Sequence, residues 1–289
     1  GQDLYSGLEA LYLAYLEDDL SYGETGADYA AALDMLLKGQ VPLSDSLAAI
    51  KGEITGPISW GLTIVDQDRR PILYDEVLED AVAKHLRLKA AWQEQALAAI
   101  CPQTLMIVNE PYMASYGTAA LTLQAPQITA LFEEVFAGLK GVKGIQCSGT
   151  TDWALLMRTS ADLICFDAYD YVDSLALAAE ELARFVNRGG ILAWGIVPAG
   201  GAARNESVDS LVTRLENGID LLVEAGVSRD RLVSQGMVSP SASLAALSVP
   251  LTEIILDLTL GVSREMQARY GQEIPTASAS EAEPPAKEQ

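Results

Sequence analysis

The sequence is poor in the residues that several classes of protein depend on. It contains 19 lysines and arginines against 40 acidic residues, which gives a formal net charge of −21. Nucleic acids and anionic membranes bind basic surfaces, so this charge argues against both as partners. No stretch approaches the roughly 18 apolar residues that a membrane-spanning helix requires. We interpret the acidity as a solvated surface that keeps the protein soluble.

Cysteine and histidine are scarce as well. Three cysteines, with no signal-peptide pattern at the N-terminus, are typical of the reducing cytoplasm, where we expect the protein to reside. The only histidine, His85, lies in the middle of a predicted helix, and a packing or surface role is expected for it.

What the sequence does contain is an ordinary globular composition, 49% hydrophobic and 20% charged over 289 residues. Apolar strands alternate with helical periodicity, which predicts an α/β fold with a parallel sheet covered by helices. Strands are expected near residues 52, 106, 144, 165, 194 and 234. Helices are expected over 3–17, 27–38, 58–65, 75–100, 127–139, 152–158, 173–187, 207–224 and 250–270. We divide the chain into an N-terminal helical segment (1–49), the α/β unit (50–272) and a disordered Ser/Ala/Glu/Pro-rich tail (273–289).

The stretch 144–153, Gly-Ile-Gln-Cys-Ser-Gly-Thr-Thr-Asp-Trp, passes directly from a predicted strand into a helix. Small polar residues at the carboxyl end of a strand, just before a helix, are where α/β proteins place their chemistry. Thr151 or Asp152 can cap the helix that follows. We therefore expect a functional site at this end of the sheet.

Five motifs at predicted strand ends resemble those of the catalytic barrel of cobalamin-independent methionine synthase and its shorter relatives in the uroporphyrinogen-decarboxylase-like superfamily. The resemblance covers about residues 51–270. Each motif alone is weakly specific, but the five occur in the same order. They are Thr55-Gly56-Pro57 with Trp60, Asn109-Glu110-Pro111, the stretch 146–153, Ala193-Trp194-Gly195-Ile196-Val197-Pro198, and Ser239-Pro240-Ser241-Ala242-Ser243-Leu244.

The resemblance implies an eight-stranded (β/α)8 barrel of the TIM type. Only six strands are predicted here, and the Gly-Ser-x-Pro motif of the family's first strand does not occur before residue 50. We expect the barrel to lack its first strands, either because residues upstream of Gly1 have been removed or because this is a natural short version. An open parallel sheet needs a cover over its edges, which the two N-terminal helices could supply.

In the family, zinc activates the thiol of homocysteine. The resemblance places Gln146 and Ser148 at the first two ligand positions and Ala242 at a later one, with Asp167 as a candidate carboxylate ligand. Amide and hydroxyl groups are poor zinc ligands and alanine is none. We predict no metal site and leave the cofactor unassigned, with a folate or a corrinoid as candidates.

The residues expected at the mouth of the barrel fall into two groups. Glu110, Asp152 and Asp167 are candidate catalytic residues, because a carboxylate at a strand end can hold a cation or move a proton. The candidate substrate-binding residues are Trp60, Asn109, Gln146, Ser148 and Trp194. The alternatives are that the carboxylates cap the following helices and that the tryptophans pack between helices and sheet.

We expect zinc-free methyl transfer that involves a folate, or a corrinoid carried by a partner protein. Asn109 stands where the family has the Asp that pairs with the substrate ammonium group, so homocysteine recognition is expected to be lost. A non-catalytic binding barrel stays open as an alternative. So does a uroporphyrinogen-decarboxylase-like enzyme, for which Arg158, Arg188 and Arg204 would have to hold substrate carboxylates. Under all three hypotheses the expected ligand is a small molecule. Whether the chain forms a homo-oligomer is left open.

Overall fold

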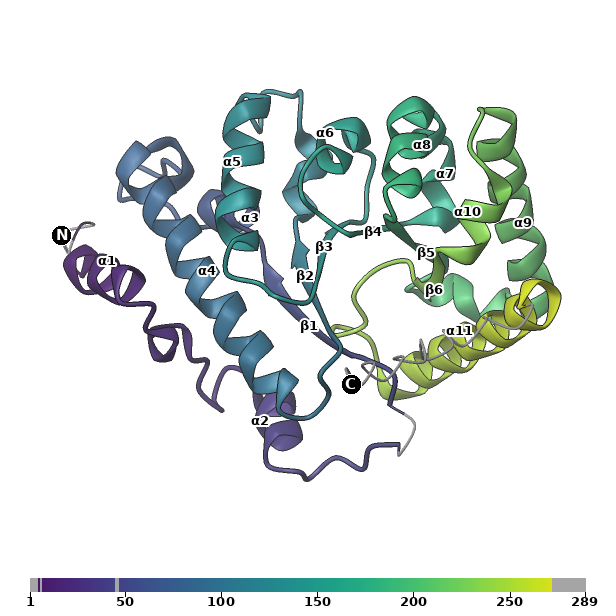
Figure 1. Cartoon of the computed structure of the whole chain (residues 1–289), viewed down its shortest axis with the longest axis horizontal. Helices are drawn as coiled ribbons and strands as arrows, with labels where there is room; N and C mark the ends of the chain where they lie inside the picture. Colours follow the sequence, from purple (N-terminus) through teal and green to yellow (C-terminus); the bar gives the residue numbers. More distant parts are fainter. Residues whose placement is uncertain (1–4, 6, 45–46, 272–289) are drawn as a thin grey trace, which may run out of the picture.

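A computed structural model describes residues 5, 7–44 and 47–271. Its centre is one sheet of six parallel strands in the order of the chain, curled into a half-barrel with helices on the convex side (Figure 1). The strands are β1 (Ile50–Thr55), β2 (Thr104–Asn109), β3 (Val142–Cys147), β4 (Leu163–Phe166), β5 (Ile191–Val197) and β6 (Gly236–Pro240).

Strands β2, β4 and β5 are short apolar runs because most of their residues are buried on both faces of the sheet. Side chains alternate along each strand, so Ile145 and Cys147 of β3 join the main core beneath the helices, while Gln146 between them faces the concave side. The concave face has a smaller apolar cluster centred on Ile107, Leu163 and Ala193. The half-barrel therefore has a packed convex side and a concave side that is only partly filled.

Helices follow each strand and bury one apolar face against the sheet. The longest, α4 (Glu76–Ala98), begins at Asp75, whose side chain accepts hydrogen bonds from the N–H groups of Val77 and Leu78. The other helices after β1 are α3 (Pro57–Thr63), η2 (Ile72–Tyr74), η3 (Pro111–Ser115), α5 (Ala125–Phe136), α6 (Trp153–Met157), α7 (Ala168–Ala176), α8 (Ala179–Asn187), η4 (Gly201–Asn205), α9 (Val208–Glu224), α10 (Arg229–Ser234) and α11 (Val249–Tyr270).

The N-terminal segment forms α1 (Leu8–Leu16), η1 (Leu20–Gly23) and α2 (Ala31–Leu37). Leu11 and Ala14 of α1 pack against Ala81 and Leu88 of α4. Figure 1 shows α1 running along the outer side of α4. The expectation that the two N-terminal helices cover the open side of the sheet is therefore wrong for α1, because its apolar face is taken up by α4.

All six predicted strands are present, and those expected near residues 52, 106, 144, 165 and 194 lie where they were predicted, but the last is displaced. The strand expected near residue 234 begins only at Gly236, because the residues up to Ser234 belong to α10. The helix expected over 173–187 is two helices, α7 and α8. The tail predicted to be disordered, 273–289, lies outside the described residues.

The fold is a partial TIM-like barrel, with six parallel strands where a complete barrel has eight. In the described chain, β1 pairs with β2 alone and β6 with β5 alone, so the eight-stranded closed barrel is not seen. None of the helices within residues 7–44 and 47–271 is long and apolar enough to cross a membrane.

Candidate functional site

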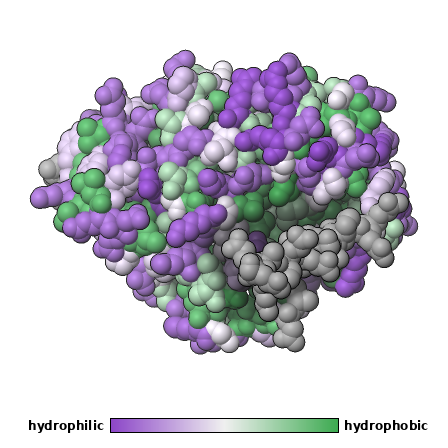
Figure 2. All heavy atoms as spheres, viewed as in Figure 1, coloured by the Kyte–Doolittle hydropathy of each residue, from purple (hydrophilic) through white to green (hydrophobic). Residues whose placement is uncertain are grey.

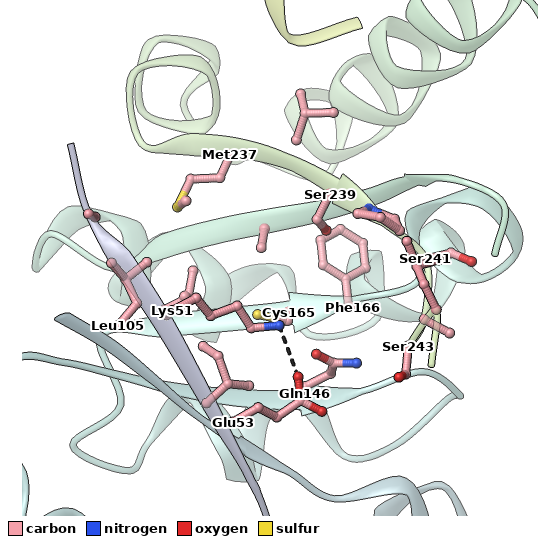
Figure 3. Close-up of a pocket in the computed structure, with 18 residues that line it drawn as sticks. Lys51, Glu53, Leu105, Gln146, Cys165, Phe166, Met237, Ser239, Ser241 and Ser243 are labelled. Atoms are coloured by element: carbon pink, nitrogen blue, oxygen red, sulfur yellow. Dashed lines mark hydrogen bonds and ion pairs between the residues drawn. The ribbon is translucent and has the colours of Figure 1, made fainter. Parts of the chain in front are cut away.

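A pocket of about 430 Å³ occupies the concave face of the half-barrel (Figure 3). Inward-facing residues of all six strands contribute to it, and the segment that follows β6 forms the wall opposite β1. Its lining is mostly apolar. The lining residues are Ala49, Lys51, Glu53, Leu105, Ile107, Gln146, Leu163, Cys165, Phe166, Ala193, Met237, Val238, Ser239, Pro240, Ser241, Ala242, Ser243 and Leu244.

Two charged side chains of β1 enter the pocket as a pair. Lys51 Nζ lies 2.9 Å from Glu53 Oε2. The other oxygen, Glu53 Oε1, accepts a hydrogen bond of 2.9 Å from Asn109 Nδ2 on the neighbouring β2. Both oxygens of the carboxylate are thus held, and Lys51 offsets its charge.

Gln146 and Cys165 are register partners on β3 and β4, and both face the pocket. Gln146 as a whole residue is nine-tenths buried, and its side-chain amide makes no hydrogen bond to any residue that the structure describes. Burial raises the pKa of the Cys165 thiol to about 12, so this group is a neutral thiol at physiological pH. The centre of the pocket is therefore polar but uncharged.

Hydroxyl groups line the side of the pocket made by β6 and the segment after it. The backbone N–H of Ser241 donates to Val197 O at 2.8 Å, and its Oγ accepts from Ala199 N at 3.1 Å. These bonds fasten the segment to the end of β5. Ser239 and Ser243 lie on the same side of the pocket (Figure 3).

Glu110, the first candidate catalytic residue, is fully buried but does not line the pocket. Its Oε1 accepts from Ile58 N at 2.9 Å and its Oε2 from Ser59 N at 2.7 Å, at the start of α3. Gly56 leaves the space for this carboxyl group, since a Cβ there would overlap it. Burial raises the pKa of Glu110 to about 7, while the N–H donors act in the opposite direction.

Asp152 and Asp167 also cap helices. Asp152 is exposed and accepts from Leu155 N at 2.9 Å at the start of α6. Asp167 is buried and accepts from Asp170 N at 3.0 Å at the start of α7, and burial raises its pKa. Neither residue lines the pocket. The three candidate carboxylates are each placed at a helix start and are not brought together around one cavity.

The candidate substrate-binding residues are divided between the two faces of the sheet. Gln146 lines the pocket, and Asn109 reaches its edge through Glu53. Trp194 is buried on the convex side, with its ring 5.3 Å from that of Phe166. Trp60 is half-buried on α3, with its ring 6.0 Å from the ring of His85 on α4.

Ser148 is half-buried just after β3 and does not line the pocket. The four positions that the resemblance links to zinc therefore supply an amide at Gln146, a hydroxyl at Ser148, a methyl at Ala242 and the helix-capping carboxylate of Asp167. This donor set does not fit zinc. No group of three His, Cys, Asp or Glu side chains in the described ranges is arranged to hold a metal ion.

The sequence does not single out Lys51, Glu53 or Cys165 as pocket residues, and it marks the serines only as part of the 239–244 motif. A signal was present: Lys51 and Glu53 alternate with apolar Ile50 and Ile54 along β1. Such alternation is typical of a strand with one polar face, and in a curled sheet that face can be the inside.

The sequence matches no protein-family model, and a search of curated proteins finds no match to it.

Proposed function

We propose that the chain is a methyltransferase-related half-barrel that binds its ligand in the concave pocket and takes part in zinc-free methyl transfer. The methyl group would pass between a folate and a corrinoid, the corrinoid being carried by a partner protein. The observation that carries the proposal is the pocket itself, to which three of the five motifs contribute residues: Gln146, Ala193 and the run from Ser239 to Leu244. Gln146 and this run lie at or just after the carboxyl ends of β3 and β6. Ligands of α/β barrels bind at the carboxyl ends of the strands.

The dimensions of the pocket favour the folate as the ligand that enters. A volume of about 430 Å³ suits a small organic molecule and can take a flat pterin ring. A whole corrinoid is larger and would present its methyl group from outside. The fold by itself supports the architecture and not the reaction, so the chemistry is the part that needs the experiment.

A non-catalytic binding protein is the second candidate, and one observation favours it. Glu110, Asp152 and Asp167 accept hydrogen bonds from backbone N–H groups at the starts of α3, α6 and α7. Carboxylates used in this way stabilise helices and are not free for proton transfer. On this reading the pocket binds a ligand and no reaction follows.

The porphyrin decarboxylase alternative gains no support. Arg158 pairs with Glu181, and Arg188 donates to the carbonyl groups of Met157, Thr159 and Ala161. Arg204 is exposed on η4. None of the three lines the pocket, where a polycarboxylate would need them.

The test is methyl transfer from methylcobalamin to tetrahydrofolate by the full chain, with methyltetrahydrofolate followed by mass spectrometry. The reaction leaves cob(I)alamin and releases one proton, so both products can be measured. We expect turnover that a chelator does not reduce. No turnover, together with saturable binding of tetrahydrofolate, would favour the non-catalytic candidate.

A variant with a blocked pocket tests whether any measured activity depends on this pocket. Ala242→Phe places a ring at the pocket wall, and we expect it to lower kcat/KM at least tenfold, or about 1.4 kcal/mol. Ala98→Phe, at an exposed position near the end of α4, is the matched control. Equal loss in both variants would separate the activity from the pocket.

A further inference from the structure

We propose that the concave pocket binds a small neutral molecule with an apolar body and a carboxamide or lactam edge, and that Gln146 recognises this edge. The inference rests on the proposed function in one respect, because both place the ligand in the same pocket. It names the class of ligand and does not depend on whether a methyl group is transferred.

The first observation is the state of Gln146. The residue as a whole is nine-tenths buried, and its side chain points into the pocket and has no hydrogen-bond partner among the described residues (Figure 3). A glutamine amide offers two N–H donors and one carbonyl acceptor. The polar atoms of this amide are not sealed in the core but open onto the pocket, so a ligand or water that enters can satisfy them. A ligand with N–H and C=O groups side by side would satisfy both ends of the amide at once.

The second observation is the charge of the pocket. Among its described lining residues, only Lys51 and Glu53 are charged, and they are paired at 2.9 Å. The thiol of Cys165 stays protonated because burial raises its pKa. An anion would have to compete with Glu53 for Lys51 and would also approach a protein of net charge −21. A cation would have to displace Lys51 from Glu53, so a neutral ligand fits best.

The third observation is the apolar surface below the polar groups. Leu105, Ile107, Leu163 and Ala193 line the pocket from β2, β4 and β5, and Met237 adds a flexible thioether from the edge strand. Small-molecule sites combine such a lining with a few placed polar groups that fix orientation. The apolar body of the ligand would rest on these side chains, with its polar edge towards Gln146.

The class of ligand can be tested with three probes that differ in one group. Nicotinamide carries the carboxamide, nicotinate is the anion of the same shape, and methyl nicotinate lacks the N–H donors. Calorimetry and ligand-observed NMR on the full chain would measure their affinities. We expect nicotinamide to bind with a Kd on the order of 1 mM, as befits a small fragment. Nicotinate and the ester should bind about tenfold more weakly or worse.

Variants locate the interaction. Gln146→Leu should weaken nicotinamide binding about tenfold and leave methyl nicotinate almost unchanged. Gln93→Leu is the matched control, because Gln93 has an unpartnered side-chain Oε1 but lies on α4 outside the pocket. Thermal melts would confirm that each variant is folded. If Gln146→Leu does not fold, Ala242→Phe still tests the location, since it should abolish binding of all three probes.

The outcomes separate this inference from the proposed function. Absence of nicotinamide binding, equal binding of nicotinate, or equal affinity in Gln146→Leu would overturn the inference whether or not methyl transfer is observed. Nicotinamide binding that depends on Gln146 would uphold it even if methyltetrahydrofolate is never formed.

Discussion

The role of a single carboxylate at a strand end depends on the backbone that follows it. Glu110, Asp152 and Asp167 each follow a strand and each accepts N–H groups at a helix start. An acid–base role and a capping role both require a carboxylate at that place, so the sequence supports the two equally. The direction of the side chain decides between them, and it is set by loop geometry that residue types do not reveal.

Glu110 should make the folded protein less stable as the pH rises through neutrality, whereas most carboxyl groups have the opposite effect. Burial raises its pKa to about 7 from the usual 4.5 of a glutamate, so the folded state binds the proton more tightly than the unfolded state does. The stability that this proton contributes is complete below the unfolded pKa and is lost as the pH rises through the folded pKa. We expect a loss of about 3 kcal/mol across this window. Urea unfolding at pH 5, 6, 7 and 8 would measure it.

Glu110→Gln removes the titration and should therefore remove this contribution to the pH dependence. The variant should also be less stable than the wild type at pH 5, because an amide NH₂ replaces one of the two acceptors of the Ile58 and Ser59 N–H groups. Glu253→Gln, at an exposed position on α11, is the control and should follow the wild-type curve. Parallel curves for wild type and Glu110→Gln would show that Glu110 titrates alike in both states.

Among the helices and strands, the apolar inner strands could be predicted from the sequence, but the position of the edge strand β6 could not. The first five strands were found because their residues are buried on one or both faces. The last strand is exposed or half-buried throughout and has few apolar residues. The predicted strand was therefore centred on the stretch that contains Leu232, which is buried in α10. The break between α7 and α8 has no Gly or Pro to mark it.

The pocket could be predicted only in part for a related reason. Gln146 was found because a motif pointed to it. Lys51 is exposed and Glu53 half-buried, so they resemble ordinary surface residues of a strand, and only the curl of the sheet directs them to the pocket. That curl is a property of six paired strands and is not visible in any one of them.

The contact between Gly56 and Glu110 should be sensitive to a single methyl group. A Cβ at Gly56 would overlap the carboxyl group that caps α3, so Gly56→Ala must displace Glu110 from the N–H groups of Ile58 and Ser59. We expect a loss of about 2–4 kcal/mol from overpacking and the lost cap. Gly26→Ala, where a Cβ would meet nothing within 4 Å, is the control for urea unfolding. Equal stability of both variants would contradict the packing described for Gly56.

In the whole molecule, the open sheet favours association between copies of the chain, and the large negative charge opposes it. The outer edges of β1 and β6 have no strand partner in the described chain, and edges of this kind pair readily with other chains. Figure 2 shows hydrophilic residues over much of the visible surface, with apolar residues gathered in smaller areas among them. Repulsion between copies that each carry a charge of −21 opposes association through the edges.

Self-association should therefore increase with salt. The Debye length falls from about 30 Å at 0.01 M to about 3 Å at 1 M, which removes the repulsion and leaves edge pairing and apolar contact unopposed. We expect sedimentation velocity to show a larger mean mass at 0.5 M NaCl than at 0.02 M. Met237→Glu, which adds a charge at the exposed edge strand β6, should reduce this association. Met35→Glu, an equal change at an exposed position on α2, should not, because α2 lies beside the lower end of α4, away from β6 (Figure 1). A monomer at every salt concentration would mean that the segment after β6 protects the edge well enough by itself.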